Sequence, residues 1–529
     1  MALGLTPQQI LDKGEHQLLV AGPHWERVAL GEVADVQNGA AFKSEFFTVK
    51  EGIPLIRIRD VGKTETENRY SGPYDESYLV YAGDIIIGMD GDFRAAYWRG
   101  EPGLLNQRVC RLKVRSPLVD KEFVFLCLQP FLDAIHAETS SVTVKHLSSR
   151  TVSQIPLPLP PLNEQRRIVA KIEELFSELD NGVESLKTAR AQLQTYRQSL
   201  LKAAFEGRLT EKWRRDHADR LETAGQLLQR IRKEQKTGYQ QEIEDWNAKV
   251  SEWENGENSG RRPKRPSFKE VESLTSQEDV EGLPALPSGW HYVRLENLGT
   301  LSRGKSMHRP RNDPSLFGGS YPFVQTAEVK AASTVIRDYS ATYNEKGLAQ
   351  SKLWPAGTLC ITIAANIAET GFLGMDACFP DSVVGFCGNE SIILSSFIEM
   401  FFRSAQDRIE AYAPATAQKN INLKTLENLI VPVCSLDEQK ELVQILEVGL
   451  SRAEELDKTL EKRIEEAEAL RQSILKYAFQ GKLVPQDPND EPASELLERI
   501  RQEQVAKPAS ESNKSSKQEV TAELLDDQN

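Results

Sequence analysis

A run of residues with the spacing of a phosphate-binding loop lies in the second half of the chain. Residues 299–306 (GTLSRGKS) fit the pattern GxxxxGK(S/T), in which backbone amides and a lysine hold nucleotide phosphates. Such a loop follows a buried strand and leads into a helix, but the next residues, MHRPRNDP, contain two prolines that oppose a helix. We therefore expect a basic loop that touches the backbone of DNA rather than a nucleotide hydrolase. The cations of this loop are Arg303, Lys305, Arg309 and Arg311.

Acidic residues that could hold a metal or activate water gather in the first half, at Asp84, Asp90 and Asp92. No acidic residue two places before a lysine follows at a useful spacing, so nuclease chemistry is not indicated. An amino-methyltransferase would need an (N/D/S)PP(F/Y/W) pocket, which the chain lacks. The six cysteines include no CxxC pair, so neither a zinc site nor a disulfide framework is expected. The pattern predicts a protein that is not an enzyme and that holds no metal or cofactor itself.

Polar side chains on loops between short apolar runs form a second kind of candidate site. Arginine suits guanine, asparagine and glutamine suit adenine, and lysine suits phosphate, so a set of such loops suits double-stranded DNA. In the first half the candidate DNA contacts are Arg57, Arg59, Asp60, Lys63, Asp90, Asp92, Arg94, Asn106, Gln107, Arg108 and Lys145. In the second half they are Gln325, Thr326, Asn366, Gln418, Lys419 and Asn420, together with the four cations above. The set, rather than any single member, carries this hypothesis.

Two long helices that repeat within the chain are the elements that would position these loops. Residues 159–209 recur in register as residues 433–483, without a gap. Proline-rich segments precede Asn163 and Asp437, which we predict to be helix N-caps, and Gly207 and Gly481 mark the C-terminal ends. The repeat distance is far longer than the roughly 20 to 50 residues of a solenoid repeat, so two large units are predicted.

The apolar pattern of both helices is a heptad. Its seam is predicted at Ile172, Leu175, Leu179, Leu186, Leu193 and Leu200, and again at Leu446, Leu456, Leu460, Leu470 and Ile474. The intervening seam positions are Gly182, Ala189, Tyr196, Ala203, Gly449, Ala453, Arg463, Ala467 and Tyr477. A helix of about 40 residues is about 60 Å long, too long to pack only on its own domain. We expect the two helices to pair as an antiparallel intramolecular coiled coil; an intermolecular coiled coil, or two unrelated amphipathic helices, is the alternative.

The remaining sequence predicts two mixed α/β (α+β) domains. The domain boundaries expected are residues 1–157 and 284–431 for these domains, 158–208 and 432–484 for the helices, 209–283 for a linker of helix fragments and polar chain, and 485–529 for a short helix and tail. The basic run RRPKRPSFK in the linker is interpreted as a solvated tether, or else as a phosphate contact. Of the net charge of −13, most lies in residues 434–529, which leaves the domains near neutral. No membrane-length apolar run or signal peptide is present, so the cytoplasm is the expected location and no membrane is expected among the partners.

These motifs resemble the specificity subunit of type I restriction-modification systems. The resemblance rests on the paired segments PLPPLNEQRRIV and PVCSLDEQKELV, on RQSLLKAAFEGRLTEKWR and RQSILKYAFQGKLV, and on GMDGDFRAAYW followed by LNQRV. It implies two target-recognition domains, each recognising one half of a bipartite asymmetric DNA site, and helices that set the spacer. It also implies that two modification (methyltransferase) subunits bring S-adenosylmethionine, and that restriction (translocase and endonuclease) subunits bring ATP and Mg. The second repeat has VPQDPND where the first has TEKWRRD, so contacts made there need not be equivalent.

Two alternatives from other classes stay open at this point. One is a structural coiled-coil adaptor that does not contact DNA. The other, which the residues after Ser306 make less attractive, is an NTPase that uses Gly304, Lys305 and Ser306 as a P-loop.

Overall fold

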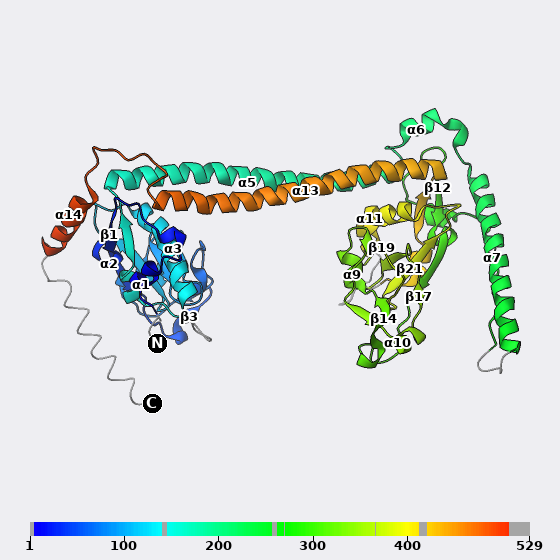
Figure 1. Ribbon diagram of the computed structural model, residues 1–529, viewed down its shortest axis with the longest axis horizontal. Helices are drawn as coiled ribbons and strands as arrows, with labels where there is room; N and C mark the ends of the chain where they lie inside the picture. The colour runs from blue at the N-terminus through cyan, green and yellow to red at the C-terminus, as the bar shows by residue number, and fades with distance from the viewer. Residues whose placement is uncertain are drawn as a thin grey trace. The chain divides into compact units, whose positions relative to one another are not determined.

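The computed structural model describes residues 5–139, 145–255, 262–268, 270–364, 367–411 and 421–506. It divides into two compact units, of which the first contains residues 1–186 and 461–529 and the second contains residues 187–460. Each unit contains a sheet-rich domain and one half of each of two long helices, α5 (Leu162–Phe205) and α13 (Leu436–Phe479) (Figure 1). The predicted class, two mixed α/β domains with two long helices, is confirmed.

The domain of the first unit contains three antiparallel or mixed sheets. A two-stranded sheet pairs β1 (Glu26–Ala29) with β11 (Pro156–Leu159). A four-stranded sheet has the order β2 (Ala34–Asn38), β10 (Val109–Val114), β7 (Ile85–Gly88) and β8 (Ala95–Tyr97). A five-stranded sheet has the order β3 (Phe47–Thr48), β5 (Arg69–Tyr70), β4 (Ile53–Ile56), β9 (Gly103–Leu105) and β6 (Leu79–Val80). The helices are α1 (Pro7–Lys13), α2 (Leu30–Val33), α3 (Lys121–Glu138), α4 (Ser149–Ser153) and α14 (Ala493–Ala506).

Strand β7 shows why its sequence is a continuous apolar run rather than an alternating one. Ile85 and Ile87 pack in one core cluster with α3, whereas Ile86 packs in another cluster with Trp98 and Val61. Because successive strand residues point to opposite faces, burial on both sides favours an apolar residue at every position. The strand thus fixes the loop that follows it, which carries Asp90.

The domain of the second unit repeats this plan. A two-stranded sheet pairs β12 (His291–Arg294) with β22 (Ile430–Val433). A five-stranded sheet has the order β13 (Gly299–Arg303), β21 (Val383–Gly388), β18 (Leu359–Thr362), β19 (Thr370–Leu373) and β15 (Val335–Ile336). A four-stranded sheet has the order β16 (Ala341–Tyr343), β14 (Phe317–Phe323), β20 (Ala377–Cys378) and β17 (Leu353–Trp354). The helices are α6 (Glu211–Asp216), α7 (Ala224–Asn255), α8 (Gln277–Val280), α9 (Thr326–Ala331), α10 (Glu345–Ala349), α11 (Ser395–Ala411) and α12 (Leu423–Glu427).

The linker differs from the prediction of helix fragments, because α7 is a single helix of 32 residues. Residues 262–268 lie back along it: the Trp246 indole N–H donates to the Pro263 carbonyl at 3.0 Å, and Arg262 pairs with Glu254 at 3.2 Å. The described part of the basic run therefore lies against the acidic C-terminal half of α7, and this partner was not foreseen because it lies outside the run itself. Self-pairing of this kind argues against the phosphate contact that was the alternative interpretation.

Helices α5 and α13 run antiparallel and pack on each other within each unit. In the second unit the Arg190 Nε, in the second half of α5, donates to Asp457 Oδ1, at the middle of α13, at 2.8 Å. In the first unit Arg471 pairs with Asp180 and lies over the Phe176 ring at 4.3 Å, early in α5 and late in α13. The antiparallel intramolecular coiled coil is confirmed.

The predicted seam of α13 is wrong at alternate positions. Leu446, Ala453 and Ile474 are buried, but Leu456 and Leu470 are 49% and 51% exposed. The packed face passes instead through the next residue along, Asp457 and Arg471, and likewise through Ala478 rather than Tyr477. The physical reason is that Asp457 and Arg471 each have an opposite charge on α5, so a seam chosen by hydrophobicity alone takes the neighbouring leucine.

The same one-residue error affects α5. Ile172 and Leu193 are buried, but Tyr196 is 50% exposed and Gly182 has open space where a side chain would be. The other predicted seam residues, Leu175, Leu179, Leu186, Leu200 and Leu460, are half-buried.

The ends of both helices follow the expected glycines but not the expected caps. Helix α5 begins at Leu162 and α13 at Leu436, so Asn163 and Asp437 lie inside the first turn and the N-cap prediction is wrong by two positions. Gly207 and Gly481 have φ of 71° and 68°, the left-handed conformation that terminates a helix.

Candidate nucleic-acid interface

Three loops of the first domain meet at one edge of its sheets. They follow β4 (residues 57–63), β7 (residues 89–94) and β9 (residues 106–108). The Asn106 amide donates to the Ile56 carbonyl at 3.1 Å, and the Met89 amide donates to the Arg108 carbonyl at 3.0 Å. A fourth segment joins them, because the Leu147 amide donates to the Met89 carbonyl at 2.6 Å. The structure therefore brings together loops that are up to 90 residues apart in sequence, counted from residue 57 to residue 147.

Asp90 is the centre of this edge. Its Oδ2 accepts from the Arg108 guanidinium, and its Oδ1 lies 2.6 Å from His146 Nδ1. Burial raises the pKa of Asp90, but the hydrogen bonds from His146 and Arg108 outweigh it and hold that pKa below its ordinary value. The Asp90 side chain is 10% exposed, whereas those of Arg108 and His146 are 57% and 60% exposed. His146 was missed by sequence reasoning because no motif spacing links it to Asp90.

Several predicted contacts in the first domain have structural roles instead. Asp60 is buried, and its Oδ2 accepts from the Arg57 amide at 2.9 Å and from the Thr66 hydroxyl at 3.0 Å. That carboxylate shapes the loop, which leaves it poorly placed for the predicted base contact. The Lys145 amine donates to the His136 carbonyl at 2.7 Å, which holds it against α3.

The remaining candidates of the first domain are accessible to different degrees. Arg57 is half-buried and lies over the Phe47 ring at 5.8 Å, and Asn106 is also half-buried. The exposed ones are Arg59, Lys63, Asp92, Arg94 and Gln107. Their contacts with bases remain predictions.

In the second domain the run that resembles a phosphate loop begins as a strand. Gly299–Arg303 is β13, paired antiparallel with β21, and the next element after Ser306 is the short 3-10 turn Pro314–Leu316 rather than an α-helix. Gly304 lies so close to the Phe379 carbonyl that an added Cβ would stand 2.2 Å from it. The first glycine of the run thus belongs to a paired strand and Gly304 serves sheet packing, an arrangement that does not support the NTPase alternative.

The predicted basic loop itself is built around Asp381. The Asp381 carbonyl accepts from Arg303 Nε at 2.8 Å, and its carboxylate Oδ2 accepts from Arg311 at 2.8 Å. Arg309 donates to the Ser306 carbonyl at 2.6 Å, and Lys305 is exposed. The loop is therefore cationic and held by its own hydrogen bonds, which is what contact with a phosphate backbone requires.

A carboxylate beside this loop is strongly acidic. Hydrogen bonds from Ser315 and from His308, whose Nε2 lies 2.7 Å from Asp313 Oδ2, lower the pKa of Asp313 to about 2.

Two of the other predicted contacts of the second domain, Gln325 and Thr326, lie at the start of α9, where the Gln325 amide donates to Glu328 at 3.0 Å. Four other predicted contacts, Asn366, Gln418, Lys419 and Asn420, lie outside the described residues.

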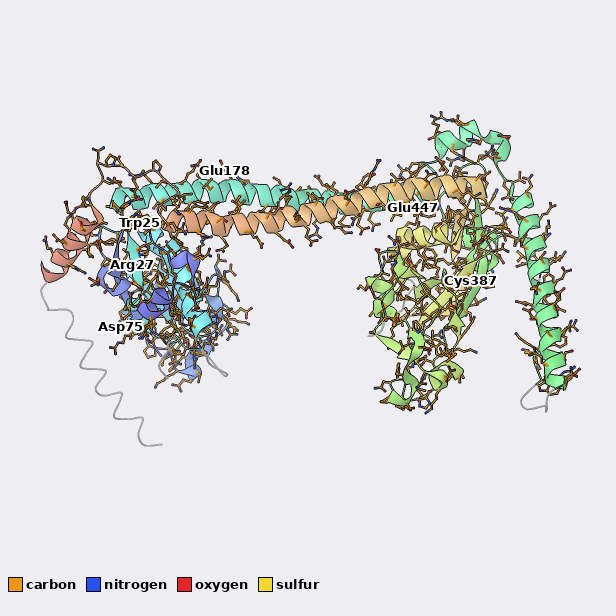
Figure 2. The ribbon with its side chains drawn as sticks, viewed as in Figure 1. Trp25, Arg27, Asp75, Glu178, Cys387 and Glu447 are labelled. Atoms are coloured by element: carbon orange, nitrogen blue, oxygen red, sulfur yellow. The ribbon has the colours of Figure 1, made fainter. Side chains whose placement is uncertain are left out.

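The junction between each long helix and its domain is a second repeated feature. Trp25, labelled in Figure 2, donates from its indole to Glu164 Oε2 at 3.1 Å, and Trp290 donates to Glu438 Oε1 at 2.8 Å. Both carboxylates are buried, and each directly follows a predicted N-cap, Asn163 or Asp437. The neighbouring Gln165 and Gln439 are also buried and bind backbone groups of their own domains. The repeated Glu-Gln pair therefore anchors the coiled coil to the domains.

The two junctions differ in what neutralises the carboxylate. Glu438 also accepts from Arg214 and from the Thr210 hydroxyl, each at 2.6 Å. In the first unit the corresponding position of Thr210 is Val484, and burial raises the pKa of Glu164 despite the bond from Trp25. The ion pair of the first junction lies between other residues, because Arg167 donates to Asp490 at 2.6 Å. The non-equivalence expected from VPQDPND against TEKWRRD is thus visible in side-chain contacts.

No described helix is both long and apolar enough to cross a membrane. Within the same described residues, no group of three or more His, Cys, Asp or Glu side chains is placed to hold a metal ion.

Comparison with known proteins matches residues 23–188 and 287–466 to the type I restriction modification DNA specificity domain. Each match covers one sheet-rich domain and part of the long helix that follows it. The chain belongs to this family. It is 31% identical over 523 residues to the type I restriction enzyme EcoBI specificity subunit of Escherichia coli, covering 96% of this chain and 98% of that protein. It is 21% identical over 516 residues to the EcoKI specificity subunit of Escherichia coli strain K12, covering 91% and 96%.

A solved structure concerned with complex assembly and conformational transition of the type I R-M system supports the fold. It aligns with a TM-score of 0.61 at 17% identity and covers 88% of this chain and 100% of that chain. Specificity subunits are the non-catalytic DNA-recognition components of type I restriction-modification systems. The specificity family therefore accounts for both domains and both helices of this chain.

Proposed function

We propose that each of the two domains recognises one half of a bipartite, asymmetric site in double-stranded DNA. The observation that carries this proposal is that two domains of the same plan present different loop chemistry. The first presents the Asp90, Arg108 and His146 cluster, and the second presents the cationic loop held by Asp381. Different donors at corresponding edges suit different base sequences.

The coiled coil would set the spacer between the two half-sites and dock the partner subunits. In this proposal two modification subunits bring S-adenosylmethionine, restriction subunits bring ATP and Mg, and the assembly acts in the cytoplasm. This chain would contribute recognition and geometry only. The domain and spacer boundaries predicted from the sequence belong to this proposal.

Replacing residues 22–160 with the corresponding domain of another specificity subunit is expected to change one half-site only. The exchanged segment includes β11, because that strand pairs with β1. The incoming domain should carry a tryptophan at position 25, so that Glu164 retains its hydrogen-bond donor. The measurement is the methylated motif in a genome that expresses the chimera with its modification subunit. A matched exchange of residues 287–434 should change the other half alone, and new bases in both halves from either exchange would refute the modular assignment.

A stripe of exposed apolar side chains on the coiled coil supports the docking part of the proposal. In the first unit it contains Leu470 and Tyr477, and in the second unit Leu456 and Tyr196, all about half exposed. Leu470 and Tyr196 occupy the same place in the internal repeat. Each unit thus presents one exposed apolar side chain at an equivalent position, which suits two copies of one partner.

Leu470→Asp is expected to remove one of two bound modification subunits, and Tyr196→Asp, at the equivalent position of the repeat, the other. Loss of a buried leucine contact costs about 2 kcal/mol, or roughly thirty-fold in affinity. Both side chains are exposed in the free chain, so folding should be unaffected. Analytical ultracentrifugation measures the stoichiometry, with Gln472→Asp, on the opposite face of α13, as the control. Two modification subunits still bound to the double variant would contradict this surface.

A further inference from the structure

Arg108, Asp90 and His146 form a preorganised unit in the first domain, and this inference rests on the proposed function. Residues 89–91 hold the other two segments by backbone hydrogen bonds. The Met89 amide donates to the Arg108 carbonyl at 3.0 Å, and the Gly91 amide donates to the Lys145 carbonyl at 3.3 Å. Asp90 and His146 are also paired as an isolated β-bridge. The side chains therefore project from a fixed frame rather than from independent loops.

Both carboxylate oxygens of Asp90 are occupied, one by Arg108 and one by His146. The sequence made Asp90 a candidate DNA contact, but its carboxylate is nearly buried and is therefore poorly placed to bind a base itself. The two side chains that donate to it, Arg108 and His146, are exposed instead. Because one nitrogen of Arg108 already donates to Asp90, the side chain loses less rotamer freedom when its other N–H groups bind a ligand. This favours a fixed bidentate contact.

We propose that Arg108 recognises a guanine in the half-site of the first domain, and that Asp90, held in turn by His146, is the positioning residue for that guanidinium. Guanine offers O6 and N7 side by side in the major groove, and a guanidinium matches that pair with two parallel N–H donors. Lysine carries the same charge but lacks the planar guanidinium with two parallel N–H donors, so it fits that pair of acceptors less specifically. The chemistry of the ligand is thus a G·C base pair at one position of the site.

Selection from DNA with both half-sites randomised, using the full chain bound to its modification subunit, tests this assignment. Arg108→Lys and Asp90→Asn are each expected to reduce the preference for guanine at one position of one half-site by about tenfold or more. All other positions, including the whole second half-site, should keep their wild-type preferences. His146→Ala should weaken the same position to a smaller degree, because it acts on Asp90 rather than on the base.

Arg115→Lys and Asp35→Asn are the matched controls, because Arg115 and Asp35 form an exposed arginine and aspartate pair in the same domain, at 3.2 Å. If Asp90 serves folding alone, Asp90→Asn lowers the melting temperature and weakens every position equally, while the exposed Arg108→Lys changes no preference; that result would overturn the inference. An unchanged guanine preference in Arg108→Lys would also overturn it, whatever Asp90→Asn does. A wild-type complex with no bipartite preference would instead contradict the proposed function itself.

Discussion

Arg214→Ala is expected to lower the free energy of unfolding of the second unit by about 3 to 5 kcal/mol, the usual cost of leaving a buried charge without its partner. Glu438 is fully buried and accepts from Arg214, Thr210 and Trp290, with the guanidinium as its sole cationic donor among the described hydrogen bonds. Arg214 also donates to the Gly207 carbonyl at 2.5 Å, so the variant loosens the end of α5 as well. Hydrogen exchange of the amides around Trp290, followed in the full chain, measures the change within this unit.

Two further variants make the Arg214 result interpretable. Glu438→Gln combined with Arg214→Ala should recover much of the lost stability, because the neutral amide no longer needs a cation. Arg167→Ala, at the ion pair of the other junction, should cost less, since Arg167 is 34% exposed and Glu164 already lacks an equivalent of Arg214. Equal losses in Arg214→Ala and Arg167→Ala, with no recovery in the double variant, would show that the Glu438 contacts are not what holds this junction.

Inserting one heptad into both long helices is expected to lengthen the DNA spacer by about three base pairs and leave both half-sites unchanged. Seven residues add about 10 Å of helix, and a base pair occupies about 3.4 Å. The insertions should duplicate residues 180–186 in α5 and 461–467 in α13, at the boundary between the two units. Because each insertion is one whole heptad, the packed face of each helix continues on the same side after it. The Arg190–Asp457 and Arg471–Asp180 pairs also stay intact. Mapping methylated motifs measures the spacer.

A heptad inserted into α5 alone is the control. The added residues then have no facing turn on α13, so specific binding should fall rather than shift to a new spacer. A site with the original spacer in the doubly extended chain would mean that the helices do not measure the distance between half-sites.

The long helices could be predicted because their pattern is local and occurs twice. The seam error shows the limit of that pattern: Asp457 and Arg471 lie on the packed face because each has an opposite charge on a helix hundreds of residues away in sequence. The Asp90 cluster could be predicted only in part for the same reason. Its residues come from three places in the chain, and nothing local to His146 indicates Asp90. The structural role of Asp60 could not be predicted, because burial of a loop carboxylate depends on neighbours that a composition pattern does not contain.

The division of the chain between its units has a consequence for biosynthesis. The second unit is one continuous stretch, residues 187–460, and can complete its core while the ribosome is still translating the C-terminal residues. The core of the first domain is completed later, because it includes Ile474, Phe479 and Leu496 as well as residues 10–172. A transcript that ends before these residues therefore yields a first domain that lacks part of its apolar core. The domain that is synthesised first thus receives the last of its core residues after the second unit is complete.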